Sequence, residues 1–435
     1  MAAGKIKIQA ADGTVNDVMY GGGGNRTTAL PNDALVGQTT LDSGLALKAD
    51  KADTYTKVET QAIVDEAVNN GTTGAYGLKW NQETDVYELL GATNRTQIQG
   101  QMKRCVVHTN ASSTAAVGDT SLNGTVNYYL DANDSTLKAD GVTASVLDGT
   151  DGNVMVEIPK FYYKHELNGN DHEWWVSPTA QTGYSLHPAF LREGTERDFR
   201  YYRAYEGYNS GGTLLSRSGV TPTRSQTRAT FRTQAGANGT GWSQTDYNLL
   251  YAVQMLFLTE YGTFNTQEVL GNGNDTGSGY GLTTGQSNGI GNGSSGSLND
   301  NMWMSYRGIE NWYADIWEFI DGVNIKDYEV FLNSNPSTFA DDVFTGDYVS
   351  TGTFVLAGAS NTFIKKLADS NQGFFPSVAG GSSSTFLTDA FWSATGNIVL
   401  SFGTDAYNGS SAGGFCLAAS LASAYSGVVG GGVSY

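Results

Sequence analysis

The sequence predicts a mainly β protein with few helices, of the α+β class. Glycine is abundant and proline is scarce, with 56 and 7 residues, and 11% of all residues are aromatic. Aromatic residues favour strands, and glycine favours the tight turns between them. Many short runs of alternating apolar and polar residues lie between clusters of Asp, Asn and Gly, which is typical of strands joined by turns.

Composition and charge exclude several classes of function. The chain has 435 residues, enough for two or three domains, and a formal net charge of −18 at pH 7. Such an acidic chain is unsuited to nucleic acid or to an anionic membrane surface. No apolar stretch reaches about 18 residues and the start lacks a signal peptide, so we expect synthesis in a cytoplasm without an export signal. Cys105 and Cys416 are expected to be free thiols.

Residues 1–40 contain one short alternating strand, expected over 5–9, and then a run of glycines. Their apolar content is too low for an independent core. We therefore expect this segment to attach the chain to a partner, with a partly ordered tail as the alternative.

Residues 41–70 differ in kind, because apolar residues recur there at spacings of four, four and three. These residues are Leu41, Leu45, Ala49 and Ala52. The spacing is typical of the seam of a short coiled coil. Thr56 and Glu59 match a capping box, which predicts a helix from there to about residue 68. Helices this short need further stabilisation, from copies of the chain or from the next domain.

Two folded regions are expected after this segment. Short strand candidates between turns predict a small β-rich domain over 71–150. A larger domain is expected over 151–435, where the apolar density rises. Near its start, a turn at 168–171 separates two strand candidates and predicts a β-hairpin.

Further along, one strong helix is expected over 244–261, with Ser243 as its N-cap and Gly262 as its stop. Its apolar residues cover most of the circumference, so the helix should be buried. The segment 306–322 is rich in aromatic residues, and we expect Trp312, Trp317 and Phe319 to lie in the core.

The last residues, 380–435, have a frame of Gly, Ser and Thr that is interrupted by side chains of very different kinds. Tyr and Trp give contact area at low entropic cost, so such a segment is typical of adaptable binding loops. Alternate residues of a strand face opposite sides, so about half of the aromatic residues here should be exposed. The residues expected to contact a binding partner are Ala390, Phe391, Trp392, Asn397, Asp405, Tyr407, Leu417, Ala418, Ser420, Leu421 and Tyr425.

Two parts of the chain resemble proteins of tailed phages. The segment LALKADKADTYTKVET, at 45–60, resembles a stretch common in tail-fibre proteins, where it forms trimeric stalks. The segments VMVEIPKFYYK, HPAFLREGTERDFRYYRAYEG, GWSQTDYNLLYAVQMLFLTEYG and MSYRGIENWYADIWEFIDG, with the Gly/Ser-rich end, resemble C-type-lectin-fold domains of phage tail proteins. These include receptor-binding proteins that are diversified by retroelements.

One motif and one departure refine this resemblance. Residues 316–319, with Asp321 and Gly322, are similar to a core signature of formylglycine-generating enzymes, which share the fold. The family commonly closes with a strand like Gly-Ala-Arg-Leu-Ser, whereas Gly432 stands here in place of the arginine. The ion pair that such an arginine could make is therefore expected to be missing.

The resemblance implies a homotrimeric tail-fibre or tail-tip adhesin of the virion. Its C-terminal lectin-like domain would bind a host cell-surface receptor, and its N-terminus would attach to another tail or baseplate protein, without catalysis, nucleic acid or membrane insertion. The alternatives are a purely structural virion tail protein and a tail enzyme that degrades polysaccharide. An enzyme of the formylglycine-generating type needs a reactive cysteine pair, whereas Cys105 and Cys416 lie in different predicted domains.

Candidate metal ligands have simpler explanations. His165, Glu166, His172 and Glu173 flank the predicted hairpin and have the side chains of a zinc site, but polar residues near a turn need no metal.

The loop over 271–296 contains Asn272, Asn274 and Asp275, which offer oxygen ligands to calcium. Neither the spacing of an EF-hand nor the triplets of calcium-dependent lectins occur. We expect no cofactor, with calcium as the open alternative.

Overall fold

The computed structural model describes residues 4–9, 15–20, 74–112, 120–275, 279–295, 303–421 and 427–435. The chain divides into two compact units, Met1–Thr72 and Thr73–Tyr435. In the first unit, β1 (Gly4–Gln9) pairs antiparallel with β2 (Val15–Tyr20), which confirms the strand predicted over 5–9. The stalk helices predicted over 41–70 lie outside the described residues.

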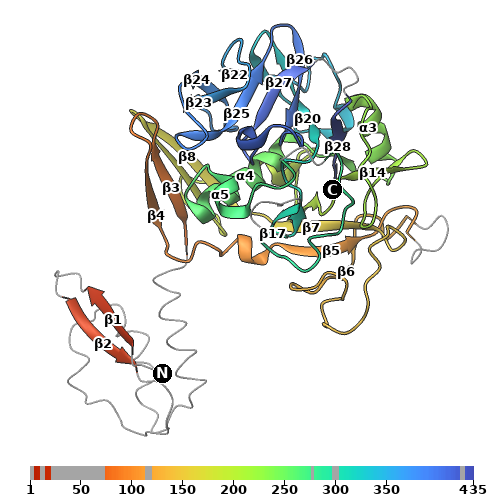
Figure 1. Ribbon diagram of the computed structural model, residues 1–435, viewed down its shortest axis with the longest axis horizontal. Helices are drawn as coiled ribbons and strands as arrows, with labels where there is room; N and C mark the ends of the chain where they lie inside the picture. Colours follow the sequence, from red (N-terminus) through yellow and green to blue (C-terminus); the bar gives the residue numbers. More distant parts are fainter. Residues whose placement is uncertain are drawn as a thin grey trace, which may run out of the picture. The chain divides into compact units, whose positions relative to one another are not determined.

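The second unit is built on sheets of five, six and nine strands (Figure 1). The five-stranded sheet has the order β10 (Ser185–Leu186), β8 (Tyr162–Asn168), β9 (Asp171–Ser177), β3 (Tyr76–Asn81) and β4 (Val86–Gly91). β8 and β9 form the predicted hairpin, with Asn168 opposite Asp171. The mainly β class predicted from composition is confirmed.

The six-stranded sheet joins the beginning and the end of this unit. Its order is β16 (Ser243–Gln244), β29 (Val433–Ser434), β13 (Phe199–Arg203), β7 (Asn153–Pro159), β5 (Lys103–Val107) and β6 (Val126–Tyr129). Strand β5 pairs with β7, and β3 pairs with β9. The domain boundary predicted at residue 150 is therefore corrected, because strands on its two sides share the same sheets.

The nine-stranded sheet contains the C-terminal segment. Its order is β22 (Val349–Phe354), β21 (Glu329–Leu332), β20 (Trp317–Lys326), β26 (Asn397–Phe402), β27 (Leu417–Leu421), β25 (Leu387–Ser393), β23 (Thr362–Leu367) and β24 (Pro376–Ala379), with β28 (Val429–Gly431) parallel to β20. Smaller ladders are β11 (Leu191–Arg192) with β12 (Thr195–Glu196), β14 (Gly207–Ser210) with β15 (Thr213–Ser216), and β17 (Gly293–Ser295), β18 (Trp303–Tyr306) and β19 (Ile309–Glu310). The sheet of nine strands thus carries most of the predicted contact residues.

Three α-helices lie in the described ranges of this unit: α3 (Arg228–Gly236), α4 (Tyr247–Tyr261) and α5 (Thr266–Leu270). Helix α4 packs against β3 and β9 on one side and β20 on the other, and it is buried as predicted. It begins after Asp246, whose side chain accepts a hydrogen bond from Leu249 N at 3.0 Å. Ser243 is not the N-cap, because it pairs with Ser434 in the six-stranded sheet. No helix within these ranges is long and apolar enough to cross a membrane.

The core lies on both faces of the nine-stranded sheet. One face packs with α4 and contains Trp312, Phe391 and Leu417. The other contains Trp317 and Phe319 and both cysteines, which are buried and free as predicted. The predicted burial of Trp312, Trp317 and Phe319 is confirmed, at exposures of 8% or less.

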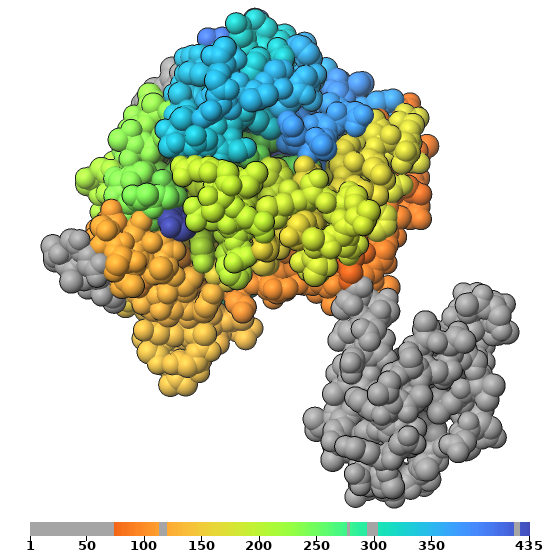
Figure 2. Space-filling view, turned by 180° about the vertical axis from the view of Figure 1, so that it is seen from behind, coloured from red at the N-terminus to blue at the C-terminus, as the bar shows by residue number. Residues whose placement is uncertain are grey.

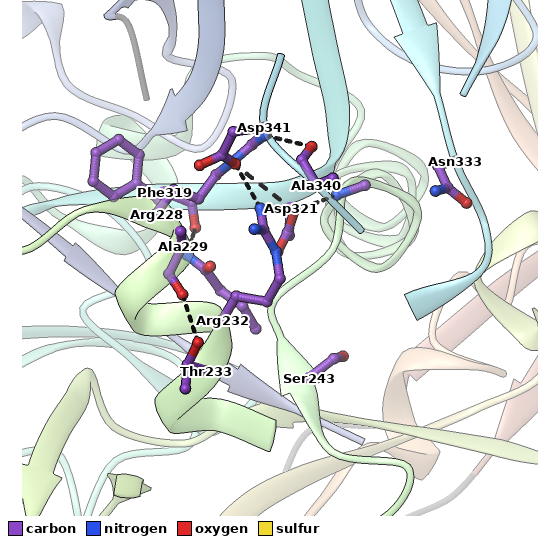
Figure 3. A network of polar contacts seen from close by, with 12 residues as sticks. Arg228, Ala229, Arg232, Thr233, Ser243, Phe319, Asp321, Asn333, Ala340 and Asp341 are labelled. Atoms are coloured by element: carbon purple, nitrogen blue, oxygen red, sulfur yellow. Dashed lines mark hydrogen bonds and ion pairs between the residues drawn. The ribbon is translucent and has the colours of Figure 1, made fainter. Parts of the chain in front are cut away.

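A buried ion-pair network joins α3 to β20 (Figure 3). Arg232 donates from Nε and Nη2 to the two carboxylate oxygens of Asp321, at 2.6 and 3.0 Å. Arg228 donates to Asp341 Oδ1 at 2.7 Å and to the carbonyl of Val323 at 2.7 Å. Arg228 and Asp321 are both fully buried. The network therefore fixes α3 and the loop of Asp341 against the nine-stranded sheet.

An arginine does reach the place where Gly432 lies, but it comes from β13. A Cβ atom at position 432 would be 2.8 Å from Arg203 Cδ and 2.6 Å from Thr245 Oγ1. Arg203 Nε lies 2.6 Å from Glu318 Oε1, and both side chains are buried. The expectation of a missing ion pair is corrected, because Arg203 fills the space that a larger residue at 432 would need.

We expect Asp389, on β25, to make the stability of this unit depend on pH. Its carboxylate accepts a hydrogen bond from Phe415 N at 2.7 Å and is 3% exposed. Burial raises the pKa of Asp389 from its ordinary value of 3.8 to about 8. Between these two pKa values the folded state binds more protons than the unfolded chain, so the free energy of unfolding should fall as the pH rises.

We expect Asp389→Asn to remove this part of the pH dependence, because an amide stays neutral in both states. Each unit of pKa shift corresponds to about 1.4 kcal/mol, so the variant should gain stability relative to the wild type towards pH 8. Urea unfolding of both proteins between about pH 5 and about pH 8 measures this difference. If the free energy of unfolding depends on pH in the same way for both proteins, this pH dependence does not come from Asp389.

Candidate binding surface

Four of the predicted contact residues belong to the core. Ala390, Phe391, Leu417 and Ala418 are between 1% and 4% exposed. Phe391 lies opposite Leu417 where β25 and β27 pair in parallel. Side chains buried in this way cannot touch a partner, so the structure corrects these four from contact residues to core residues.

The other predicted contact residues differ in exposure. Trp392, Ser420 and Leu421 are half-buried, Asn397 and Tyr407 are exposed, Asp405 is 8% exposed, and Tyr425 lies outside the described residues. The alternation along β25 explains Phe391 and Trp392, since neighbouring residues of a strand face opposite sides of the sheet. Among the described aromatic residues, Phe391 and Phe402 are buried while Trp392 and Tyr407 reach the surface.

The two exposed residues lie at opposite ends of the sheet. Asn397 begins β26 opposite Lys326, whereas Tyr407 follows the other end of this strand, where Phe402 lies opposite Glu318. Six residues of a strand span about 17 Å at 3.3 Å per residue. The structure therefore does not bring Asn397 and Tyr407 into one site.

Tyr407 instead pairs with a tyrosine from the glycine-rich loop. Its ring centroid is 4.8 Å from that of Tyr280, and Tyr407 is 58% exposed. The guanidinium of Arg224 lies 5.3 Å from the centroid of the Tyr280 ring, a cation–π contact. We call Arg224, Tyr280, Tyr407 and Asn408 the tyrosine surface.

Two buried aspartates position the loops of this surface. Asp405 Oδ1 accepts hydrogen bonds from Tyr407 N at 3.0 Å and from Asn408 Nδ2 at 2.8 Å. Asp315 accepts from the backbone N–H groups of residues 281 and 282, at 3.0 and 2.9 Å. Residues 315 and 405 also pair in a parallel β-bridge. The two tyrosines are therefore presented by one shared framework.

Burial raises the pKa of both Asp315 and Asp405 above the ordinary range for a carboxyl. Hydrogen bonds from the backbone to each carboxylate act against this rise. Such buried acceptors fix the geometry of a loop. If the loop moved away, the buried carboxylate would lose its hydrogen bonds, which costs free energy.

Trp392 extends the surface along the sheet. Its ring packs edge-on against Trp317, with centroids 5.4 Å apart. Trp317 in turn lies near Asp405, which holds Tyr407. Trp392 and the half-buried Leu421 thus give an apolar margin beside the tyrosine surface.

Asp341, Glu196 and His187, which lie outside this surface, have structural roles. Asp341 binds the two arginines of the network, and Glu196 pairs with Lys160 at 2.7 Å. His187 is fully buried among aromatic rings. None of these residues offers an exposed acid–base pair.

His165 and His172 bind each other. Their Nε2 and Nδ1 atoms are 2.9 Å apart, and their rings stack with Trp174. Burial lowers the pKa of His172 to about 3, so it is neutral near pH 7. Glu166 lies opposite Glu173 in the hairpin, and both project from the other face of the sheet. The structure therefore does not assemble these four residues into a zinc site.

The loop considered for calcium is held by hydrogen bonds. Asn274 donates from Nδ2 to Asp315 Oδ1 at 2.6 Å and to the carbonyl of Gly279 at 2.7 Å. Within the ranges that the structure describes, no three His, Cys, Asp or Glu side chains converge as a metal site. The Asn274 side chain therefore links its loop to Asp315, which also positions Tyr280.

Sequence reasoning missed Arg224, Tyr280 and Asp315 as members of the surface. They lie 183, 127 and 92 positions before Tyr407, so no local pattern connects them. One signal was present, because Tyr280 is an aromatic residue within a run of glycines, like the residues expected near the C-terminus.

Comparisons with known proteins add little to this fold and site. No family model matches the sequence, and no curated protein matches it. A solved structure titled "Major Tropism Determinant P3c Variant" is similar at 10% identity, over 83% of this chain and 72% of that chain, with a TM-score of 0.24. A likeness of this degree carries no argument for either fold or function. The fold itself defines a mainly β protein with a buried central helix.

Proposed function

We propose that this protein is a phage tail adhesin that binds a host cell-surface receptor through the tyrosine surface. The single observation that carries the proposal is the pair of the half-buried Tyr280 and the exposed Tyr407, held by Asp315 and Asp405. Aromatic side chains contribute a large share of the energy in protein interfaces. A rigid pair also loses little conformational entropy on binding.

The resemblance of 45–60 and 153–435 to phage tail proteins supplies the class of protein. On this reading the adhesin is a homotrimer in the virion, and its N-terminal segment attaches to another tail or baseplate protein. The receptor-binding domain has a C-type-lectin-like fold, and sequence variation by a retroelement would act on its C-terminal segment. Three copies of the tyrosine surface would multiply the affinity of one copy.

Replacing Tyr280 and Tyr407 together by alanine is expected to weaken binding to host cells by at least about 30-fold per copy, the value for one interface hot spot. The physical reason is the loss of exposed aromatic area, since both rings reach the surface. The measurement is binding of purified protein to intact host cells.

The matched control is Phe354→Ala. Phe354 is 57% exposed, similar to Tyr407. It lies opposite Glu329, however, at the end of the sheet where Asn397 lies and away from the end that Tyr407 follows. We expect this variant to bind normally and both variants to keep the wild-type melting temperature. A well-folded double variant that still binds cells would move the receptor site away from the tyrosine surface.

A further inference from the structure

A second candidate site, which shares no residue with the tyrosine surface, is a groove with a volume of about 570 Å³. Its walls come from the β11–β12 hairpin, the residues between β21 and β22, and the loop before β24, and the first turn of α4 contributes to its floor. In Figure 2 the lime, cyan and blue segments that line it meet on the face towards the viewer. Its volume falls within the range of small-molecule sites, about 300–1,000 Å³.

The lining of this groove is rich in amides and lacks positive charge. Five of its sixteen residues are Asn or Gln, two are the acidic residues Glu193 and Asp347, and none is Lys, Arg or His. We call it the amide groove. Amide and carboxylate groups together donate and accept hydrogen bonds, as the hydroxyl groups of a sugar do.

Part of the lining is fixed and part is free for a ligand. Asn248 Nδ2 donates to Ser334 Oγ at 3.2 Å, and Asn335 Nδ2 donates to Asp347 Oδ2 at 3.0 Å. Tyr163 donates from its hydroxyl to the carbonyl of Asn371 at 2.8 Å, which anchors that loop.

The side chains of Glu193, Asn371 and Gln372, by contrast, have no hydrogen bond to any residue that the structure describes, although they line the groove. Glu193 and the two amides are also exposed to solvent. The groove thus combines a positioned floor with unpaired donors and acceptors on its rim.

We infer that the amide groove binds a short stretch of a neutral oligosaccharide, at a site that shares no residue with the tyrosine surface. An acidic sugar would meet Glu193 and Asp347 without any compensating cation in the lining. Leu191 and Val349, which are 46% and 64% exposed, supply the apolar contact that the C–H faces of a sugar ring need.

An extended peptide fits this groove less well. The neighbouring edge strand, β22, would have to pair with such a peptide through its backbone. Its ladder with β21 contains a register shift, and Gly352 has a φ of 69°, so the edge is not a regular strand. The observations therefore favour hydroxyl groups over a peptide backbone as the ligand chemistry.

Ligand-observed saturation-transfer NMR on the full chain tests this inference. The neutral probes are the β-1,4-linked tetrasaccharides of glucose, mannose and N-acetylglucosamine; the acidic probe is tetragalacturonate, and the peptide probe is Ala-Val-Ala-Val. We expect saturation transfer to at least one neutral tetrasaccharide and none to the other two probes. The signal should fall at least about five-fold in Asn371→Ala/Gln372→Ala and also fall in Glu193→Ala, because each variant removes free hydrogen-bonding groups.

The Tyr280→Ala/Tyr407→Ala variant should keep the full signal, which separates this site from the proposed receptor surface. Melting temperatures check that the variants remain folded; every substituted position is exposed except Tyr280, which is half-buried. The inference is overturned if no neutral tetrasaccharide receives saturation, if only the acidic probe or the peptide does, or if the groove variants retain the signal. Such a result would not contradict the proposed receptor binding through the tyrosine surface, which is tested separately by cell binding.

Discussion

Asp321→Ala is expected to destabilise the protein by about 3–5 kcal/mol, which for many domains is a large part of the total stability. The change removes both carboxylate oxygens to which Arg232 donates, and it takes a negative charge from beside the fully buried Arg228 (Figure 3). An uncompensated charge in a protein interior is costly, and α3 would lose its link to β20. Urea unfolding gives the free energy directly.

The matched control for this variant is Asp198→Ala, which breaks an ion pair with Lys160 at the surface. The Asp198 side chain is 75% exposed, so its loss should cost no more than about 1 kcal/mol. Equal effects of the two substitutions would contradict the structural role assigned to the buried network.

We proposed that the protein is a homotrimer; on that proposal, removing residues 1–70 is expected to give a monomer and to weaken cell binding by about 10²–10⁴-fold through lost avidity. The apolar seam at 41–52 motivates this expectation, and Thr73–Tyr435 is a compact unit that should fold without it. Light scattering reports the mass of the particle, and binding to intact cells reports the avidity.

A second variant keeps the chain length. Leu41→Asp/Leu45→Asp places charges in the expected seam and should give the same loss of trimer. If the shortened chain remains a trimer, assembly depends on residues 71–435 instead, and the stalk prediction fails.

Local sequence patterns predicted local structure well. The turn at 168–171 predicted the β8–β9 hairpin, and the all-round apolar pattern predicted that α4 is buried. The boundary at residue 150 could not be predicted in this way. The register that pairs Tyr76 with Val176 joins residues a hundred positions apart, and nothing in either segment encodes its partner.

The candidate site also could not be predicted from local sequence patterns alone. Phe391 and Trp392 lie in the same Gly/Ser/Thr frame, and alternation alone shows that one is buried but not which one. The pairing of β25 with β27 determines which of the two side chains is buried. Asp405 was expected to contact a partner, whereas its Oδ1 atom accepts hydrogen bonds from Tyr407 and Asn408.

Gly432 illustrates compensation between distant positions. The closing strand lacks the arginine that the resemblance suggests, yet Arg203 reaches the same space and pairs with Glu318. Sequence comparison one position at a time cannot detect such an exchange, because the arginine lies on another strand of the sheet.

Site-specific photocrosslinking tests the central claim, that the tyrosine surface is the part of the protein that touches the host cell. Ser410→Cys places a single reactive thiol beside Tyr407, because Ser410 is exposed while Cys105 and Cys416 are buried. Phe354→Cys gives the same label at the far end of the sheet. Both variants, labelled with a maleimide benzophenone, are bound to host cells and irradiated. We expect a crosslinked host-surface molecule from position 410 and none from position 354; crosslinking from position 354 alone would show that the tyrosine surface does not contact the host cell.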